Sequence, residues 1–375
     1  MKIEVKQLKE PFPYKQIADL LQRTYFEEYT EMGSLLWNEE YAKFYINVVM
    51  FKEESKKFIF GAFKNNKLIG TLFGHHDPII LDNEIQLETL NLGLLSVNPE
   101  YRRQGVAKAL LTKLIDEAKK DKIDLLMGFP EKGRFGDNLL KQHFDFKYYG
   151  KAKHLLKLME DTGLHVLREY YKVNPVIVKI ATLYAHVPDL GEPEGIMRKG
   201  QIEDYPKATE LINSYRSRVP LSMRYTQIGR QKPKDEFTPP KVGEPWNFYF
   251  WLLERNNQII AALHNRIELA TFKVEDGSLV NLPVALLARV AFHQDLEMDQ
   301  KVKFINCILR KVRSEIPAAF ATQICSCQHE MKVFRKLKFI SDRSYYYLYM
   351  RPLTKKGEEI NRHRRYKEYY LDYYR

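Results

Sequence analysis

The sequence predicts an α/β protein built from two domains of similar element order, and three observations support this prediction. Residues 90–97 form an apolar run suited to a buried strand, and a turn and then apolar residues at helical spacing follow over 106–118. A hairpin that turns at Asn65-Asn66 precedes that strand. A similar order of elements begins again near residue 195. A chain of 375 residues is long enough for two such domains.

The other elements follow from the same two periodicities. The first half is expected to contain a strand at residues 3–5, helices at 14–28 and 38–49, a hairpin at 58–73, a strand at 123–129, a short helix at 138–144, and closing strands at 146–149 and 155–159. The second half is expected to contain a strand near 196, a helix through 208–215, a hairpin at 247–263, a strand at 282–290 and a helix at 301–312.

Breaks in the pattern predict where the domains end. Pro188, Gly191 and Pro193 interrupt the chain, so we expect a first domain at residues 1–160, a connector at 161–190, a second domain at 191–353 and a tail at 354–375. The tail is basic and carries tyrosines at helical spacing: Tyr366, Tyr369, Tyr370, Tyr373 and Tyr374. A terminal helix that packs these tyrosines on the body is favoured over a contact with nucleic acid.

Composition limits the class of protein. The chain is 45% hydrophobic and 29% charged, as in globular proteins, and no apolar run is long enough for a membrane span. The N-terminus does not resemble a signal peptide, and the three cysteines are expected to be reduced core thiols, so a cytoplasmic location is predicted. Cys325-x-Cys327 has the wrong spacing for a zinc pair, and no metal is expected. The net charge of +12 suits a polyanionic ligand.

The turn between the central strand and helix can bind an anion. The first N–H groups of a helix have no partners within the helix and attract phosphate. Gly105 and Ala107 are small enough for a close approach to the backbone, and Arg102, Arg103 and Lys108 add positive charge. An ordinary strand-turn-helix with an exposed basic turn remains an alternative explanation of these residues.

The pattern Val97-x-Pro99-x-x-Arg102-x-x-Gly105-x-Ala107 resembles motif A of the GNAT superfamily of N-acetyltransferases. The resemblance implies two GNAT-like domains, each a mixed, mainly antiparallel twisted sheet flanked by helices. It also implies that acetyl-CoA binds here, with Leu95 and Val97 offering backbone groups to pantetheine. The residues implied to hold the pyrophosphate are Arg102, Arg103, Gln104, Gly105, Val106, Ala107 and Lys108.

At the positions of the residues that perform chemistry in this family, this sequence has residues of other types. Lys141 occupies the position where many members have a tyrosine that protonates the thiolate, and Asn91 occupies that of a glutamate that activates water. Glu88 is the nearest carboxylate, and Tyr148 is a tyrosine near the acid position. The catalytic candidates are therefore Glu88, Asn91 and Tyr148.

The second half resembles a GNAT fold that has lost CoA binding. The stretch that corresponds to the turn has no glycine and carries Asp295, Glu297 and Asp299, which would repel a pyrophosphate. The resemblance thus implies an N-acetyltransferase that moves an acetyl group from acetyl-CoA to an unidentified amine, with the first domain catalytic. The alternatives are a non-catalytic acyl-CoA sensor or scaffold and, less favoured, a nucleic-acid-binding protein. No membrane partner is expected.

Overall fold

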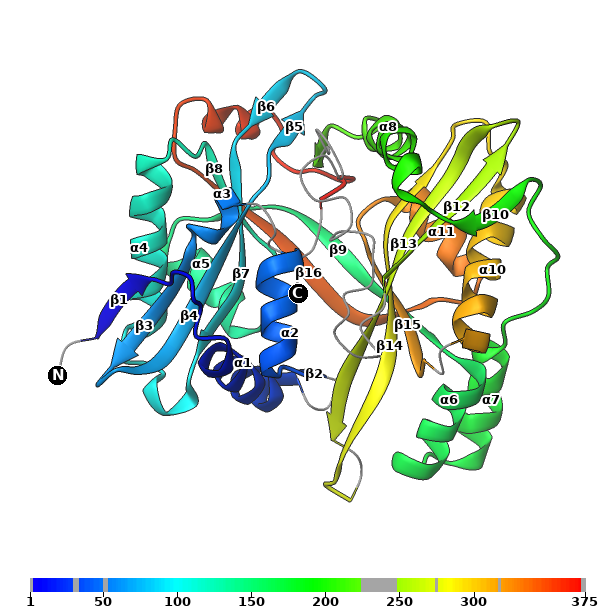
Figure 1. Ribbon diagram of the computed structural model, residues 1–375, viewed down its shortest axis with the longest axis horizontal. Coiled ribbons are helices and arrows are strands. Elements are labelled where there is room, and N and C mark those ends of the chain that lie inside the picture. The colour runs from blue at the N-terminus through cyan, green and yellow to red at the C-terminus, as the bar shows by residue number, and fades with distance from the viewer. Residues whose placement is uncertain are drawn as a thin grey trace.

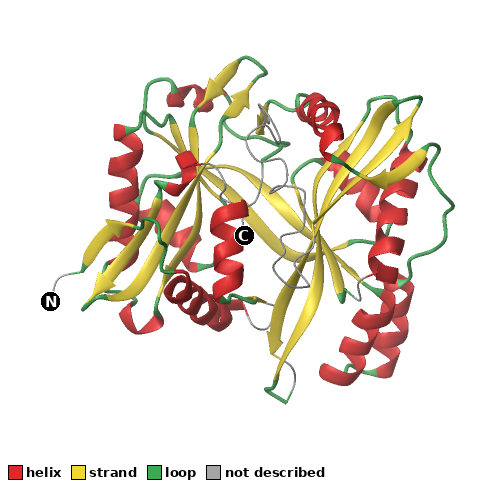
Figure 2. Cartoon of the chain, in the orientation of Figure 1, coloured by secondary structure: helices red, strands yellow, loops and turns green. Residues whose placement is uncertain are grey.

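The computed structural model describes residues 3–29, 34–49, 53–223, 248–273, 276–315 and 318–371. One twisted sheet runs through both halves of the molecule, with helices on its two faces (Figures 1 and 2). The described part of this sheet has thirteen strands, twelve of them in the order β1-β3-β4-β7-β8-β16-β9-β15-β14-β13-β12-β10, and β2 pairs with β13. The α/β fold class and the mixed, mainly antiparallel sheet predicted from the sequence are confirmed.

The first half follows the predicted order. Its sheet strands and helices are β1 (Glu4–Gln7), α1 (Tyr14–Tyr29), β2 (Ser34–Leu35), α2 (Glu39–Phe44), α3 (Glu53–Lys56), β3 (Ile59–Lys64), β4 (Lys67–His76), β7 (Thr89–Val97), α4 (Val106–Lys120), β8 (Leu125–Gly128) and α5 (Phe135–His143). A π-helical turn, Tyr45–Val49, extends α2. The strands β5 (Ile79–Leu81) and β6 (Ile85–Leu87) form a separate small sheet with β11 (Leu221–Met223).

The second half repeats this order after a helical connector. The connector contains α6 (Glu160–His165), a π-helical turn (Val166–Tyr170) and α7 (Pro175–Ala185). The half itself contains β10 (Ile196–Lys199), α8 (Tyr205–Arg216), β12 (Phe248–Arg255), β13 (Gln258–Lys273), β14 (Leu279–Phe292), α10 (Met298–Glu315), β15 (Phe320–Cys325) and α11 (Gln328–Lys336).

The two halves exchange their last strands. The strand β9 (Lys147–Leu158) leaves the first half and pairs with β15, whereas β16 (Ile340–Pro352) returns from the second half and lies between β8 and β9. Two closing strands were predicted at 146–149 and 155–159, and this prediction was wrong, because β9 is one continuous strand. The predicted domain boundaries stay a prediction.

Apolar side chains on both faces of the first-half sheet hold the helices in place. On one face, α1 and α2 pack on Ile59, Leu68, Phe73 and Leu94. On the other face, α4 buries its periodic apolar residues, among them Leu110 and Leu114, against β3, β4 and β7. This is the helix periodicity that the sequence predicted.

The tail does not form the predicted helix. Its described part contains a 3-10 helix, Gly357–Arg362, and then extended chain in which Tyr370 bridges to Ser222. Tyr366 and Tyr369 are nevertheless buried on the body, as expected, whereas Tyr373 and Tyr374 lie outside the described residues.

Two further features bear on the predictions from composition. All three cysteines are buried free thiols, as predicted. Within the described ranges, no helix is both long and apolar enough to cross a membrane.

Candidate acyl-CoA site

A cavity of about 610 Å³ lies where β7 and β8 separate. The two strands pair in parallel as far as Leu92 and Gly128. Beyond Gly128 the chain stays with β16, through a bridge between Glu131 and Tyr346, so it departs from β7. The opening between the strands is lined on the β7 side by Leu92, Gly93, Leu94, Leu95 and Val97, and on the β8 side by Gly128, Phe129, Pro130 and Glu131.

A β-bulge shapes the β7 wall of this cavity. Thr71 of β4 faces Ser96 and Phe73 faces Gly93, so the single intervening residue of β4 opposes two residues of β7, Leu94 and Leu95. Leu94 has a φ of 48°, and the Thr71 hydroxyl donates to its carbonyl at 3.2 Å. A bulge interrupts the ladder and re-aims the backbone. The backbone at Leu94 and Leu95 is thus released from regular pairing at the cavity wall, which the sequence alone did not predict.

The N-terminus of α4 opens onto the mouth of the cavity. The turn before it bends at Arg103, with a φ of 60°, and at Gly105, with a φ of 81°. A Cβ added at Gly105 would meet no atom within 4 Å, so space for a ligand lies above it. Because the first N–H groups of α4 have no partners within the helix, they can donate to an anion held there.

The sequence match agrees with this geometry. Residues 14–129 match the family model described as the acetyltransferase (GNAT) family, and the match ends one residue after β8. These residues form a GNAT domain.

The fold likeness extends over nearly the whole chain. Saccharomyces cerevisiae N-myristoyltransferase, solved with bound myristoyl-CoA, has a TM-score of 0.73 at 13% identity over 93% of this chain and 82% of that one. A GCN5-related N-acetyltransferase from Anabaena variabilis has a TM-score of 0.53 at 11% identity, over 94% and 73% of the two chains. A conserved Enterococcus faecalis protein of unknown function, described as a probable N-acyltransferase, has a TM-score of 0.54 at 10% identity, over 94% of this chain and 72% of that one. No curated protein matches the sequence.

Most of the predicted CoA-binding residues of the GNAT domain line the cavity. They are Leu95, Val97, Arg102, Arg103, Gly105, Val106, Ala107 and Lys108. Gln104 is the exception, because its side chain donates to the carbonyl of Glu100 at 3.1 Å and accepts from Lys64 Nζ at 3.5 Å. Its predicted role in holding pyrophosphate therefore requires its backbone or a rotation of the side chain.

Arg102 is engaged by acidic residues of α1. Its Nη2 lies 3.3 Å from Glu28 Oε1 and 3.4 Å from Glu27 Oε2. Arg134, on the β8 side, donates from Nη1 to the Glu28 carbonyl at 3.1 Å. Burial raises the pKa of the Glu28 carboxyl, and the charges of Arg102 and Arg134 oppose that rise. Glu28, Arg102 and Arg134 all line the cavity, so a bound pyrophosphate would compete with Glu28 for Arg102.

The three catalytic candidates do not line the cavity. Glu88 Oε2 lies 3.0 Å from His76 Nε2, and Glu88 precedes Leu92 by four strand residues, or about 13 Å. Asn91 is buried beside His75 in the ladder. Tyr148 packs its ring against Tyr347 and Tyr349, and burial raises its pKa. Their catalytic roles stay predictions, as does the expectation that the exposed Lys141 is not essential.

Two titratable residues at the cavity wall come from the exchanged strands. His154 of β9 and Tyr346 of β16 line the cavity, with ring centroids 6.4 Å apart in an edge-to-face arrangement. His143 of α5 lines it as well. The sequence places His143 near the position of the family's tyrosine but not on it, so it was not chosen as a candidate. Sequence reasoning missed the pairing of His154 with Tyr346, because strand exchange brings together residues about two hundred positions apart.

The second half repeats the bulge but not the anion site. Ala262 faces Ala291 and His264 faces Ala288, so Arg289 and Val290 together oppose one residue of β13. Arg289 has a φ of 49°, close to the 48° of Leu94 in the GNAT domain. The stretch that follows carries Asp295, Glu297 and Asp299 before and within the start of α10, as the sequence indicated. Among the described residues, no group of three metal-ligating side chains converges.

Proposed function

We propose that this protein is an acyl-CoA-dependent N-acyltransferase whose GNAT domain carries out the reaction. The observation that carries the proposal is the coincidence of two features: a cavity between separating strands and an open helix N-terminus at its mouth. In this proposal the pyrophosphate of CoA accepts hydrogen bonds from the start of α4 and pairs with Arg103 and Lys108. The pantetheine arm runs along β7 and bonds the backbone at Leu95 and Val97.

The reaction would be a direct acyl transfer. A neutral amine attacks the thioester carbonyl carbon, a C–N bond forms, and the C–S bond breaks to release CoA thiolate, while the amine proton passes to solvent or a base. In this proposal, backbone N–H groups at the Leu94–Leu95 bulge polarise the carbonyl oxygen, and the release of this backbone from regular pairing supports that role. Holding the thioester and amine together in the cavity would supply much of the rate by proximity.

Acetyl is the donor that the family resemblance implies, but the cavity favours a longer chain. The cavity wall also carries apolar side chains from elements other than β7, including Leu35, Trp37, Leu72 and Leu156. A two-carbon group would leave this wall uncovered, whereas an aliphatic chain would bury it. The N-myristoyltransferase that shares the fold was solved with myristoyl-CoA. We therefore extend the proposed donor from acetyl-CoA to acyl-CoA with a longer chain.

A non-catalytic acyl-CoA sensor is the second candidate. It is favoured by the positions of Glu88, Asn91 and Tyr148, none of which lines the cavity. The three free thiols support the predicted cytoplasmic location, and this location is compatible with both candidates.

Turnover separates the two candidates. Purified protein is incubated with acetyl-, octanoyl- or myristoyl-CoA and a panel of small amines and peptides with free N-termini, and thiol release is followed. We expect amine-dependent thiol release, faster with the longer donors. Tight acyl-CoA binding without release for any acceptor would favour the sensor, and faster release with acetyl-CoA would restore acetyl as the donor.

A further inference from the structure

The connector helix α7 exposes a stripe of large apolar side chains. The α7 stripe consists of Val176, Ile177, Ile180, Leu183 and Tyr184, whose exposed fractions run from 48% to 66%. At 100° per residue these five positions cover roughly 120° of the helix surface. The helix stands with α6 at the outer edge of the molecule (Figure 1). Contiguous exposed apolar surface of this kind marks a site of interaction.

The stripe is not the face that attaches α7 to the body. Val178 and Ala185, on another side of the helix, are buried with Leu164 of α6. The helix thus uses one apolar face for packing and has a second one left over. A connector needs only the first of these, so the second requires another explanation.

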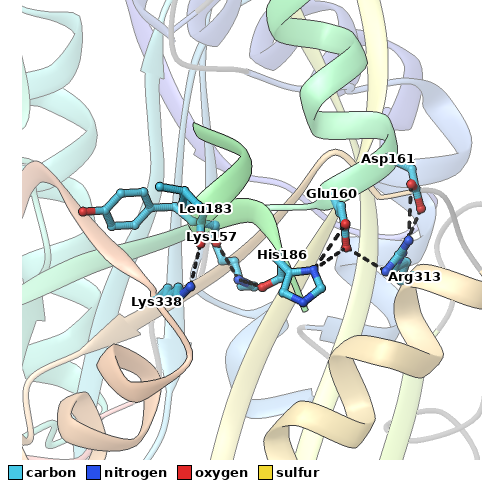
Figure 3. Close-up of polar contacts among 8 residues, drawn as sticks. Lys157, Glu160, Asp161, Leu183, His186, Arg313 and Lys338 are labelled. Atoms are coloured by element: carbon cyan, nitrogen blue, oxygen red, sulfur yellow. Dashed lines mark hydrogen bonds and ion pairs between the residues drawn. The ribbon is translucent and has the colours of Figure 1, made fainter. Parts of the chain in front are cut away.

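The end of α7 is fixed by two lysines, as Figure 3 shows. Lys157 Nζ donates to the carbonyl of Tyr184 at 2.7 Å and to that of His186 at 3.2 Å, and Lys338 Nζ donates to the carbonyl of Leu183 at 2.7 Å. Cations at a helix C-terminus satisfy its last carbonyls and oppose its dipole. At the other end, Asn174 accepts from the N–H of Val176. The α7 stripe is therefore presented by a helix that is held at both ends.

The charges around the stripe are mainly positive. Lys179 lies on α7 itself, Lys172 shortly precedes it, and Lys338 reaches its end; all three are exposed. The nearby acids Glu160 and Asp161 are both paired with Arg313, at 2.8 Å each (Figure 3). The whole chain carries a net charge of +12. An apolar stripe bordered by lysines suits a surface that is apolar inside and anionic at its boundary.

We propose that the α7 stripe docks the protein on a lipid bilayer that carries anionic headgroups, with the helix parallel to the membrane plane. The apolar side chains enter the boundary of the hydrocarbon region, and Lys172, Lys179 and Lys338 contact headgroups. A second copy of the chain fits this face less well, because two such faces would bring like charges together. Docking on a bilayer revises the expectation from the sequence that the protein has no membrane partner. The docking proposal does not depend on the proposed acyl transfer.

Vesicle co-sedimentation of the full chain tests the proposal. Vesicles contain phosphatidylcholine alone or phosphatidylcholine with phosphatidylserine. The stripe variant combines Ile177→Ser, Ile180→Ser and Leu183→Ser, and its matched control combines Ile196→Ser and Leu279→Ser, two similarly exposed apolar residues of other elements. Because all five side chains are mostly exposed, both variants are expected to fold, which circular dichroism checks.

We expect the wild type and the control to bind phosphatidylserine vesicles, with binding that weakens as salt is added. The partition coefficient of the stripe variant should fall by at least about tenfold. The double variant Lys172→Glu/Lys179→Glu should lose the preference for phosphatidylserine. Equal partition of stripe variant and control would overturn the proposal. The proposal would also be overturned if the wild type did not bind vesicles but formed a dimer that the stripe variant abolished, because the stripe would then bind a second copy of the chain.

Discussion

The hydroxyl of Tyr41 donates to Glu268 Oε1 at 2.9 Å and so joins α2 of the first half to β13 of the second. Both side chains are buried, and Arg266 Nη2 lies 2.5 Å from the same carboxylate oxygen. Burial raises the pKa of Tyr41 well above its usual value, so this phenol is a donor throughout the stable pH range. The contact connects the covering helices of the GNAT domain to a strand 227 residues later in the chain.

Replacing this donor should weaken the connection between the halves. We expect Tyr41→Phe to lower the free energy of unfolding by about 1–3 kcal/mol, because a buried carboxylate loses a hydrogen bond. Urea unfolding of Tyr41→Phe, Glu268→Gln and the double variant gives the coupling energy. The control pairs Glu268→Gln with Tyr366→Phe, which removes a bond to Ile360 of its own segment. Equal coupling in both cycles would mean that Tyr41 and Glu268 do not interact specifically.

A negative charge at Gly105 should remove CoA binding. Gly105→Glu places a carboxylate where the pyrophosphate would sit, and we expect the affinity for CoA to fall by at least about a hundredfold, or roughly 3 kcal/mol. Gly277→Glu is the control, since Gly277 has a φ of 83° against 81° for Gly105, and an added Cβ meets no atom within 4 Å at either position. Both variants therefore carry similar backbone strain.

Isothermal titration calorimetry measures this effect and the stoichiometry together. The acids Asp295, Glu297 and Asp299 of the second half predict one CoA site per chain. Unchanged binding by Gly105→Glu would show that the turn before α4 is not where CoA binds, and two equivalent sites would show that the second half also binds CoA.

Local pattern was enough to predict the elements that build the site. The strand at 90–97, the turn and the helix at 106–118 correspond to β7, its following turn and α4, because their apolar residues recur at strand and helix periods. The cavity wall was not predictable in the same way. The positive φ of the bulge falls on Leu94 and not on the neighbouring Gly93, and the contribution of Tyr346 depends on where β16 inserts.

The insertion of β16 changes what a fragment can do. A chain that ends near Glu160 corresponds to the predicted first domain but lacks β16, which pairs with both β8 and β9. We expect such a fragment to leave these strands unpaired and to aggregate or remain unfolded. Circular dichroism and size-exclusion chromatography of the fragment check this, with the full chain as the control. A monomeric, folded fragment that binds CoA would show that β16 is dispensable.

Glu330 should make the stability of the second half depend on pH. The residue is 4% exposed, its carboxyl accepts from Gln323 Nε2 at 2.8 Å, and burial raises the pKa of this carboxyl from 4.5 to about 7. Because the folded state binds this proton more tightly, the stabilisation is complete below pH 4.5 and is lost as the pH rises through about 7. A shift of this size corresponds to an upper limit of about 3 kcal/mol.

Glu330→Gln keeps the shape of the side chain and removes the titration. We expect the variant to gain stability over the wild type at pH 8 and to flatten the decline between pH 5 and pH 8, as measured by urea unfolding across that range. The exposed Glu84 supplies the control variant, Glu84→Gln. An unchanged slope in Glu330→Gln would assign the pH dependence to other groups.

Removing the side chain at 141 should leave turnover nearly intact. Lys141 occupies the position of the family's tyrosine, but it is exposed on α5 and does not line the cavity. CoA thiolate is a fair leaving group, because a free thiol has a pKa of about 8.5, so its departure can proceed without a positioned acid. We therefore expect Lys141→Ala to change kcat by less than about tenfold, whereas a true general acid contributes a factor of about 10²–10⁴ to the rate.

Turnover under saturating acyl-CoA is compared among Lys141→Ala, Tyr148→Phe and His143→Ala. Tyr148→Phe alters a phenol outside the cavity, and His143→Ala alters a ring at the cavity wall. A thousandfold loss in Lys141→Ala with unchanged CoA affinity would mean that this lysine has taken over the tyrosine's role, and that the α5 helix moves it to the thiolate when the substrate binds.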